Sequence, residues 1–159
     1  MPRINLQLFI SAPHQRVFNL ARSVEVHVAS TKHTGERVVG GRMSGLFQLG
    51  DTVTWRAKHF GVWQELTSRI TEMQPYSCFV DEMVKGAFHS FRHEHRFSAI
   101  DDNNMLMDDV FEYQSPLGFL GILADKLFLQ QYMTNLLQQR NECIKAVAEG
   151  KDWQRFVQE

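Results

Sequence analysis

The most constraining feature of the sequence is a row of segments in which apolar and polar residues alternate. They cover residues 53–59, 62–73, 78–85, 88–100 and 105–114, and breaks of turn length separate them. A period of two residues is typical of a strand with one buried face, and short connections pair successive strands antiparallel. The sequence therefore predicts a long antiparallel meander over residues 53–114.

The two ends of the chain add helices to this sheet. Residues 3–11 alternate as a further strand, and residues 14–29 have helical spacing, either as one helix or as two helices broken near Arg22. We expect residues 30–50, which are rich in glycine, to be a loop region with one short strand. A long helix is predicted over residues 119–149. At 159 residues the chain is interpreted as a single domain, residues 1–150, with a C-terminal tail, residues 151–159.

Composition excludes several classes of protein. The net charge of −1 gives no basic excess for binding a nucleic acid. The two cysteines match no metal-binding spacing, and a pair this sparse is typical of a reducing compartment. The N-terminus shows no apolar signal segment, and no apolar run is long enough to cross a bilayer. We therefore predict a cytoplasmic protein without membrane insertion.

The predicted architecture has a hollow interior. A sheet of six or seven strands is roughly 30 Å wide, at about 4.8 Å per strand. One helix with its side chains is about 10–12 Å across and does not fill the concave face of such a sheet. We expect a cavity between the sheet and the long helix, of the kind that binds small molecules.

Side-chain parity predicts which polar groups face this cavity. In the segment 88–100, His93 and His95 share a face with Phe91 and Phe97. By the same argument, Asp109 shares a face with Phe111 and Tyr113, His59 with Trp55, and Gln64 with Leu66. The segment 78–85 stays ambiguous, because Phe79, Asp81 and Met83 oppose the equally apolar set Cys78, Val80, Glu82 and Val84. For Asp81 or Glu82 we expect a salt bridge with Arg92 or Arg96.

Several short strings in this order resemble a known family. They are ARSVEVH at 21–27, TGER at 34–37, WRAKHFG at 55–61, FVDEM at 79–83, HEHRF at 93–97, and DVFEY at 109–113 followed by PLG at 116–118. They are similar to the START-like superfamily, also called Bet v 1-like or SRPBCC, and within it to a bacterial ligand-binding subgroup, and the resemblance covers residues 3 to about 148. The resemblance implies an α+β helix-grip fold, in which a curved seven-stranded antiparallel sheet wraps around the C-terminal helix and encloses a cavity.

The resemblance also implies a range of functions. Members of the superfamily are described as polyketide cyclases or dehydratases, as lipid carriers and as cell-division inhibitors. Similar domains occur fused to a sugar-nucleotide epimerase-like domain, so an epimerase-like partner protein is a candidate. This chain has no GxGxxG fingerprint of its own. The oligomeric state is left open.

The sequence thus predicts the binding of a hydrophobic or amphipathic small molecule, lipid-like or polyketide-like, in an internal cavity. The predicted ligand-binding residues are Trp55, His59, Gln64, Leu66, Phe91, His93, His95, Phe97, Asp109, Phe111, Tyr113, Leu123 and Leu127. The first alternative is an enzyme of the cyclase or dehydratase type, with His95, His93 and Asp109 as acid and base. The second is a regulatory interaction domain whose interior is filled by aromatic packing.

The pair His93-x-His95 has two further interpretations. Both imidazoles can share a metal ion, with His59 or Asp109 as a third ligand. Both can also belong to a buried hydrogen-bonded network with Asp109. No HExxH motif and no cysteine ligand supports a metal, so we predict neither a metal nor a cofactor.

Overall fold

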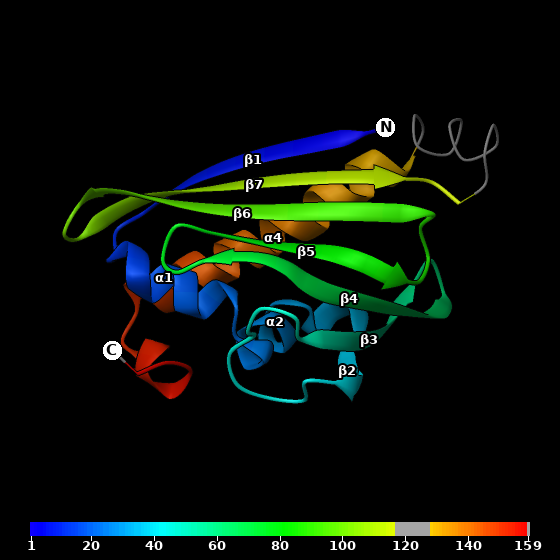
Figure 1. Cartoon of the computed structure of the whole chain (residues 1–159), viewed down its shortest axis with the longest axis horizontal. Coiled ribbons are helices and arrows are strands. Elements are labelled where there is room, and N and C mark those ends of the chain that lie inside the picture. Colours follow the sequence, from blue (N-terminus) through cyan, green and yellow to red (C-terminus); the bar gives the residue numbers. More distant parts are fainter. Residues whose placement is uncertain (117–127, 159) are drawn as a thin grey trace.

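The computed structural model describes residues 1–116 and 128–158, and its strands form one antiparallel sheet (Figure 1). The strands are β1 (Arg3–Ile10), β2 (Arg37–Gly41), β3 (Thr52–His59), β4 (Val62–Gln74), β5 (Cys78–Lys85), β6 (Ser90–Asp101) and β7 (Asn104–Gln114). Their order across the sheet is β1-β7-β6-β5-β4-β3-β2. The meander predicted from alternation is confirmed, and β1 joins it at the edge by pairing with β7.

The helices lie on one side of the sheet. They are α1 (His14–Ala21), α2 (Val24–Ser30) and α4 (Gln130–Glu149), with 3₁₀ turns η1 (Lys32–Thr34) and η3 (Asp152–Arg155). In Figure 1, α4 runs behind β5, β6 and β7, and it packs against α1, α2 and β1. The predicted α+β helix-grip architecture is confirmed. Of the helix predicted over residues 119–149, residues 119–127 lie outside the described residues.

The N-terminal helical region consists of two helices rather than one. The chain breaks at Arg22, whose guanidinium binds the Asn19 side chain at 2.8 Å and the backbone carbonyl of Phe47 at 2.9 Å. Ser23 then caps α2 by accepting a hydrogen bond from the Val26 amide at 3.3 Å. After this break α2 packs against α4 and stacks His27 on Trp55 of β3, with ring centroids 4.0 Å apart.

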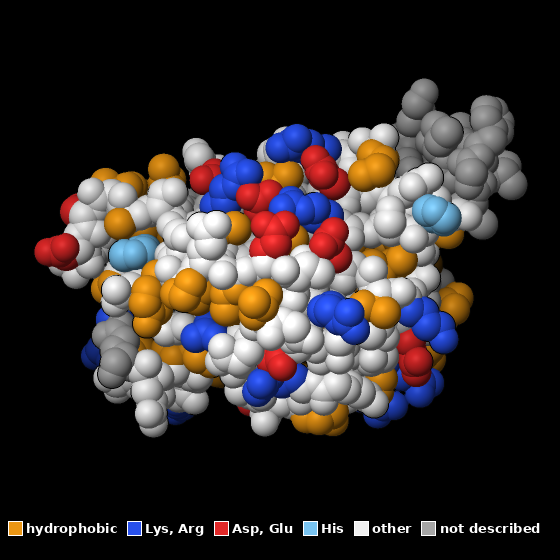
Figure 2. Space-filling view, in the orientation of Figure 1, with side chains coloured by type: hydrophobic (Ala, Val, Ile, Leu, Met, Phe, Trp, Pro, Cys, Tyr) orange, Lys and Arg blue, Asp and Glu red, His pale blue; other side chains and the backbone are white. Residues whose placement is uncertain are grey.

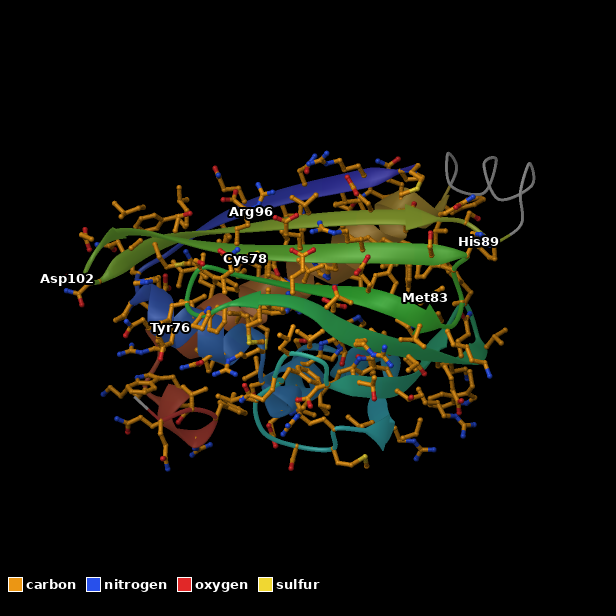
Figure 3. The ribbon with its side chains drawn as sticks, in the orientation of Figure 1. Tyr76, Cys78, Met83, His89, Arg96 and Asp102 are labelled. Carbon is orange, nitrogen blue, oxygen red and sulfur yellow. The ribbon has the colours of Figure 1, made fainter. Side chains whose placement is uncertain are left out.

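The outer face of the sheet is charged. Figure 2 shows Lys, Arg, Asp and Glu side chains gathered over β6 and its neighbours. Arg92 pairs with Glu94 at 2.6 Å and with Glu72 at 3.2 Å, and Arg96 pairs with Glu94 at 2.5 Å. Figure 3 shows the label of Arg96 midway along β6, between His89 at one end and Asp102 at the other. This charged ladder marks the solvent side, so the opposite parity of β6 faces the helices.

The C-terminal tail packs on the core. Val157 is buried, and Trp153 and Phe156 lie against the same apolar cluster as Ile144 and Ala148 of α4. The Arg16 guanidinium stacks over the Trp153 ring at 4.0 Å. No helix within residues 1–116 and 128–158 is both long enough and apolar enough to cross a membrane.

Candidate ligand-binding site

A cavity of about 630 Å³ lies between the sheet and α4. Most of its wall is apolar, from rings and aliphatic side chains of β3, β4, β6, β7 and α4. Five described lining residues are themselves solvent-exposed and therefore mark the mouth: Phe60, Glu65, Ala87, Pro116 and Phe128. The size is within the range of about 300–1,000 Å³ for small-molecule sites, and the expected cavity is present.

Eight of the predicted ligand-binding residues line this cavity. They are Trp55, His59, Gln64, Leu66, Phe91, His93, His95 and Phe111. Leu123 and Leu127 lie outside the described residues.

Three other predicted residues are buried outside the lining of the cavity. Phe97 packs against Phe18 of α1, with ring centroids 5.3 Å apart, because α1 covers that end of the sheet. Tyr113 is fully buried next to Phe88, and Asp109 lies behind His95. Parity therefore predicted correctly that all three side chains lie on the inner face of the sheet. None of the three lines the cavity.

A layer of polar residues crosses the core at one level, between two apolar clusters. On β5, Asp81 lies between Phe79 and Met83, and on β6, His93 and His95 lie between Phe91 and Phe97. On β7, Asp109 lies between Met107 and Phe111. On α4, Arg140 lies between Leu137 and Ile144. We call these five residues, Asp81, His93, His95, Asp109 and Arg140, the polar layer. Strand register produces it, because Asp81 is the partner of His93 and His95 is the partner of Asp109.

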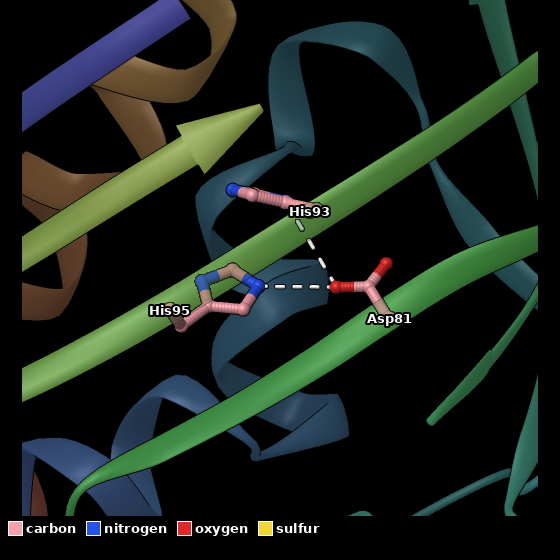
Figure 4. Close-up of side chains that lie close together, drawn as sticks. All are labelled: Asp81, His93 and His95. Atoms are coloured by element: carbon pink, nitrogen blue, oxygen red, sulfur yellow. Dashed lines mark hydrogen bonds and ion pairs between the residues drawn. The ribbon is translucent and has the colours of Figure 1, made fainter. Parts of the chain in front are cut away.

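His95 is held from both sides by carboxylates. Its Nδ1 lies 2.7 Å from Asp109 Oδ1, and its Nε2 lies 3.0 Å from Asp81 Oδ1 (Figure 4). A neutral imidazole has only one N–H, so only the imidazolium donates to both carboxylates. Burial alone lowers the pKa of His95, but Asp109 and Asp81 outweigh it, so the pKa is raised.

The carboxylates of the polar layer stay ionised. Burial raises the pKa of Asp109, but the charge and the hydrogen bond of His95 outweigh burial, and the pKa falls well below its ordinary value. Burial also raises the pKa of Asp81, but its neighbours outweigh burial and lower the pKa, and the hydrogen bond from His95 contributes most to this lowering. Arg140 Nη1 lies 3.5 Å from Asp109 Oδ2. Two carboxylates thus face one imidazolium and one guanidinium, and the layer is charge-balanced.

His93 differs from His95 in having no hydrogen bond of its own. Nδ1 lies 3.9 Å from Asp81 Oδ1, Nε2 lies 3.7 Å from Asp109 Oδ1, and Nε2 makes no hydrogen bond within the described part of the chain. Burial, followed by the positive charge of His95, lowers the pKa of His93, so the ring is neutral. Its ring contacts His95 and Phe111, with centroids 3.9 and 5.2 Å apart. A neutral imidazole is therefore available in the cavity wall.

A second polar group lies in the wall near β3. His59 Nδ1 lies 2.6 Å from the Tyr132 hydroxyl of α4, and His27 pairs with Glu36 while stacking on Trp55 at 4.0 Å. Burial lowers the pKa of His59, outweighing the carboxylate of Glu36. Burial raises the pKa of Glu36, but its pairing with His27 outweighs burial and lowers it. These contacts join α2 and α4 to the sheet across the cavity.

The structure corrects the expectation for Asp81. This carboxylate faces the cavity and binds His95, whereas Arg92 and Arg96 lie on the outer face with Glu94. Sequence reasoning also missed Arg140. Its spacing from Met133, Leu137 and Ile144 puts it on the apolar face of the helix, and that signal was readable in the sequence.

Comparison with known proteins supports the fold. No family model matches the sequence, and no curated protein matches it either. A structure from Thermus thermophilus superposes with a TM-score of 0.73 at 17% identity, over 91% of this chain and 94% of that one. A START superfamily protein of Mycobacterium smegmatis has a TM-score of 0.68 at 8% identity, over 92% and 97% of the two chains. The chain has the START-like fold.

A third structure with this fold is the Zhui aromatase/cyclase of Streptomyces sp. R1128. Its TM-score is 0.66 at 11% identity, over 92% of this chain and 95% of that one. At such identities the START-like likeness extends to the arrangement of strands and helices, and the chemistry of the polar layer has to be argued from this chain's own residues.

Proposed function

We propose that this START-like protein binds a hydrophobic or amphipathic small molecule, lipid-like or polyketide-like, in the cavity. The observation that carries the proposal is a hollow of about 630 Å³ with a mostly apolar wall, which Asp81, His93, His95 and Arg140 of the polar layer also line. Burial of apolar ligand surface supplies about 25 cal/mol per Å², and a few fixed polar groups orient the ligand.

The wall suggests how such a ligand lies. Trp55, Phe91 and Phe111 offer flat apolar surfaces, and the neutral ring of His93 offers one donor and one acceptor. Asp81 Oδ1 is used by His95, whereas its second oxygen adds an acceptor on the cavity side. A hydroxyl or carbonyl group of the ligand fits this patch, and its apolar part fits the aromatic wall.

One tryptophan reports directly on occupancy. Of the three tryptophans, Trp55 lines the cavity, whereas Trp63 is 49% exposed and Trp153 lies on the C-terminal tail. In the double variant Trp63→Phe, Trp153→Phe, fluorescence comes from Trp55 alone. We expect saturable changes in its emission on adding a long-chain fatty acid or 1-anilinonaphthalene-8-sulfonate in the presence of EDTA.

The matched control retains the exposed Trp63 as its single tryptophan, in place of Trp55. In the variant Trp55→Phe, Trp153→Phe, the remaining Trp63 should show no saturable change. Native mass spectrometry of the protein purified without denaturation should also show a bound small molecule. Unchanged Trp55 emission with every probe, together with a mass of protein alone, would overturn the proposal.

The acid–base alternative depends on His93. Both nitrogens of His95 are engaged by carboxylates, which leaves His93 as the imidazole of the polar layer with a nitrogen that no described residue bonds. A cyclase or dehydratase reaction would use it to accept a proton from a bound polyketide-like substrate. His93→Gln keeps hydrogen-bonding capacity but removes the base. It should retain probe binding and abolish turnover of a linear polyketide mimic, whereas equal turnover in both proteins would exclude the alternative.

The filled interaction domain gains no support from a hollow of this size. An epimerase-like partner protein and a cytoplasmic location stay predictions.

A further inference from the structure

We propose that Asp81, His93 and His95 form a binding site for a divalent transition-metal ion, with Zn²⁺ the ion that best suits the donor set. Each residue offers one donor atom, and the three atoms lie within 4.8 Å of one another. Within residues 1–116 and 128–158, this is the one group of three or more His, Cys, Asp or Glu side chains that comes so close. The site goes beyond ligand binding and does not depend on it.

The spacing of the donors is near that of a tetrahedral site. Zinc bonds to histidine nitrogen and carboxylate oxygen are about 2.0–2.2 Å, which separates two tetrahedral ligands by about 3.3–3.5 Å. His95 Nε2 lies 3.0 Å from Asp81 Oδ1, and His93 Nδ1 lies 3.9 Å from the same oxygen. Figure 4 shows His93 and His95 of β6 each joined by a dashed line to the same oxygen of Asp81. Shifts of less than about 1 Å in the donor atoms bring these two pairs to ligand spacing, and the donors of the two imidazoles lie within 4.8 Å of each other.

The surroundings of His95 are those of a metal-binding histidine. Its other nitrogen, Nδ1, donates to Asp109 Oδ1 at 2.7 Å, and Asp109 is in turn paired with Arg140 at 3.5 Å. Metal-binding imidazoles commonly direct their second N–H at a carboxylate, which fixes the ring and makes the ligating nitrogen more basic. Asp109 and Arg140 are thus placed to orient the ligand without touching the ion.

His93 supplies an independent observation. The ring is 7% exposed, and its Nε2 makes no hydrogen bond to any described residue. A buried polar group left without a partner costs about 1–3 kcal/mol, so native proteins usually satisfy it. Coordination through Nδ1 gives the ring one bonding partner and leaves its N–H on Nε2, which lies 3.7 Å from the acceptor Asp109 Oδ1.

Charge indicates what completes the site. The ion replaces the proton that His95 Nε2 directs at Asp81, and this proton leaves to solvent. The net charge of the two carboxylates, Arg140 and the divalent ion is then +1. Without the ion, the two carboxylates, Arg140 and the protonated His95 have a net charge of zero. Three protein ligands leave a fourth position on the cavity side, and the excess charge favours an anionic oxygen there, from hydroxide or from a carboxylate or enolate.

The test titrates Zn²⁺ into tag-free protein that has been dialysed against EDTA and then freed of it. We expect one ion per chain by calorimetry, and Co²⁺ should give the visible absorption of a four-coordinate site. His93→Ala and Asp81→Asn should each weaken binding by at least about 100-fold, since removing an outer partner alone costs 10–100-fold. His93 is the safer change for folding, because it makes no hydrogen bond in the described chain.

A matched control separates this site from ordinary surface binding. His89 precedes β6, is exposed and lies at the strand end remote from Asp102 in Figure 3. His89→Ala should keep the wild-type affinity within about twofold, as expected for a residue outside the site. Equal affinity in wild type, His93→Ala and Asp81→Asn, or no stoichiometric binding by wild type, would overturn the site. Because the Trp55 titration is run in EDTA, failure of the metal site leaves ligand binding intact, and failure of ligand binding leaves the metal titration intact.

Discussion

At the scale of single residues, two adjacent aspartates of β7 show how parity assigns different roles. Asp108 is on the outer face and accepts a hydrogen bond from Gln7 at 2.7 Å. Asp109 is 1% exposed and carries one of the two negative charges of the polar layer. Of these two adjacent aspartates, Asp108 therefore makes a surface contact, whereas Asp109 is a buried counter-ion.

Removing each carboxylate should cost very different amounts of stability. Asp109→Ala leaves His95 and Arg140 without their buried partner, and such changes cost about 3–5 kcal/mol. Asp108→Ala removes one surface contact and should cost less than about 1 kcal/mol. Urea unfolding at pH 7 followed by circular dichroism measures both. Equal losses would mean that the polar layer is not the charge-balanced unit described above.

Glu36 gives the protein a pH-dependent contact between helix and sheet. It faces His27 of α2 and His59 of β3, with Tyr132 of α4 nearby, and its pKa lies below the ordinary 4.5. A lowered folded-state pKa contributes stability above the unfolded value, and that stability is lost as pH falls through the folded value. Glu36→Gln should therefore be less stable than wild type at pH 5.5, with the difference shrinking toward pH 3. Exposed Glu142→Gln should show no such trend; a constant difference for Glu36→Gln would contradict the assignment.

Residue-level prediction succeeded where alternation was unambiguous. His93, His95 and Asp109 lie in strands whose two faces differ clearly in polarity, and all three are buried as parity required. Asp81 lies in a strand with apolar residues on both faces, so its direction is fixed by pairing with β6 and not by its own pattern. The pairing of β4 with β5 also shifts register twice. The inward-facing positions of β5 therefore cannot be predicted by counting alternate residues onward from β4.

At the scale of elements, the edge of the sheet is shaped by a glycine. Gly41 ends β2 at a φ of +73°, and a Cβ there would lie 2.2 Å from the backbone oxygen of Thr52 on β3. Gly45 has a similar φ of +81°, but no atom lies within 4 Å of its Cβ position. The two positions therefore separate conformational strain from steric conflict.

Alanine substitutions at Gly41 and Gly45 should differ in their effect on stability and on the pairing of β2 with β3. Gly45→Ala should cost about 1–2 kcal/mol, the strain of a left-handed alanine. Gly41→Ala adds a backbone clash that forces β2 away from β3, so we expect a loss of about 3 kcal/mol or more. Thermal unfolding compares them, and amide hydrogen exchange should increase along β2 only for Gly41→Ala. Equal losses would show that β2 tolerates displacement.

Element types were predictable because each long segment keeps one period, whereas boundaries depended on tertiary contacts. The break at Arg22 needs the Phe47 carbonyl, which lies in a loop whose position the local pattern does not encode. The short strand expected within residues 30–50 is β2, and its pairing with β3 includes a register shift between Val38 and Gly40. Both features need a partner distant in sequence.

At the scale of the whole molecule, the hollow follows from a mismatch between a seven-stranded sheet and one long helix. The mismatch predicts that space remains, but not where it lies. The two short helices fill one end, where Phe18 packs against Phe79 and Phe97 with ring centroids 5.8 and 5.3 Å apart. The hollow extends from Phe79 to the exposed rings at the mouth. Placing α1 required long-range contacts, so the sequence indicated a cavity without separating its lining from the packed core.

If this hollow is where ligands bind, filling it should remove binding without unfolding the protein. Ala57 of β3 is 2% exposed and lines the cavity, so Ala57→Phe places a ring in existing space. Apolar burial of about 25 cal/mol per Å² offsets the repacking cost, so stability should stay within about 1 kcal/mol of wild type. Affinity for 1-anilinonaphthalene-8-sulfonate should fall at least about tenfold, because the ring competes for the same volume. Ala146→Phe, on the exposed face of α4, should bind as wild type does. Wild-type affinity in a folded Ala57→Phe protein would place the probe outside the cavity.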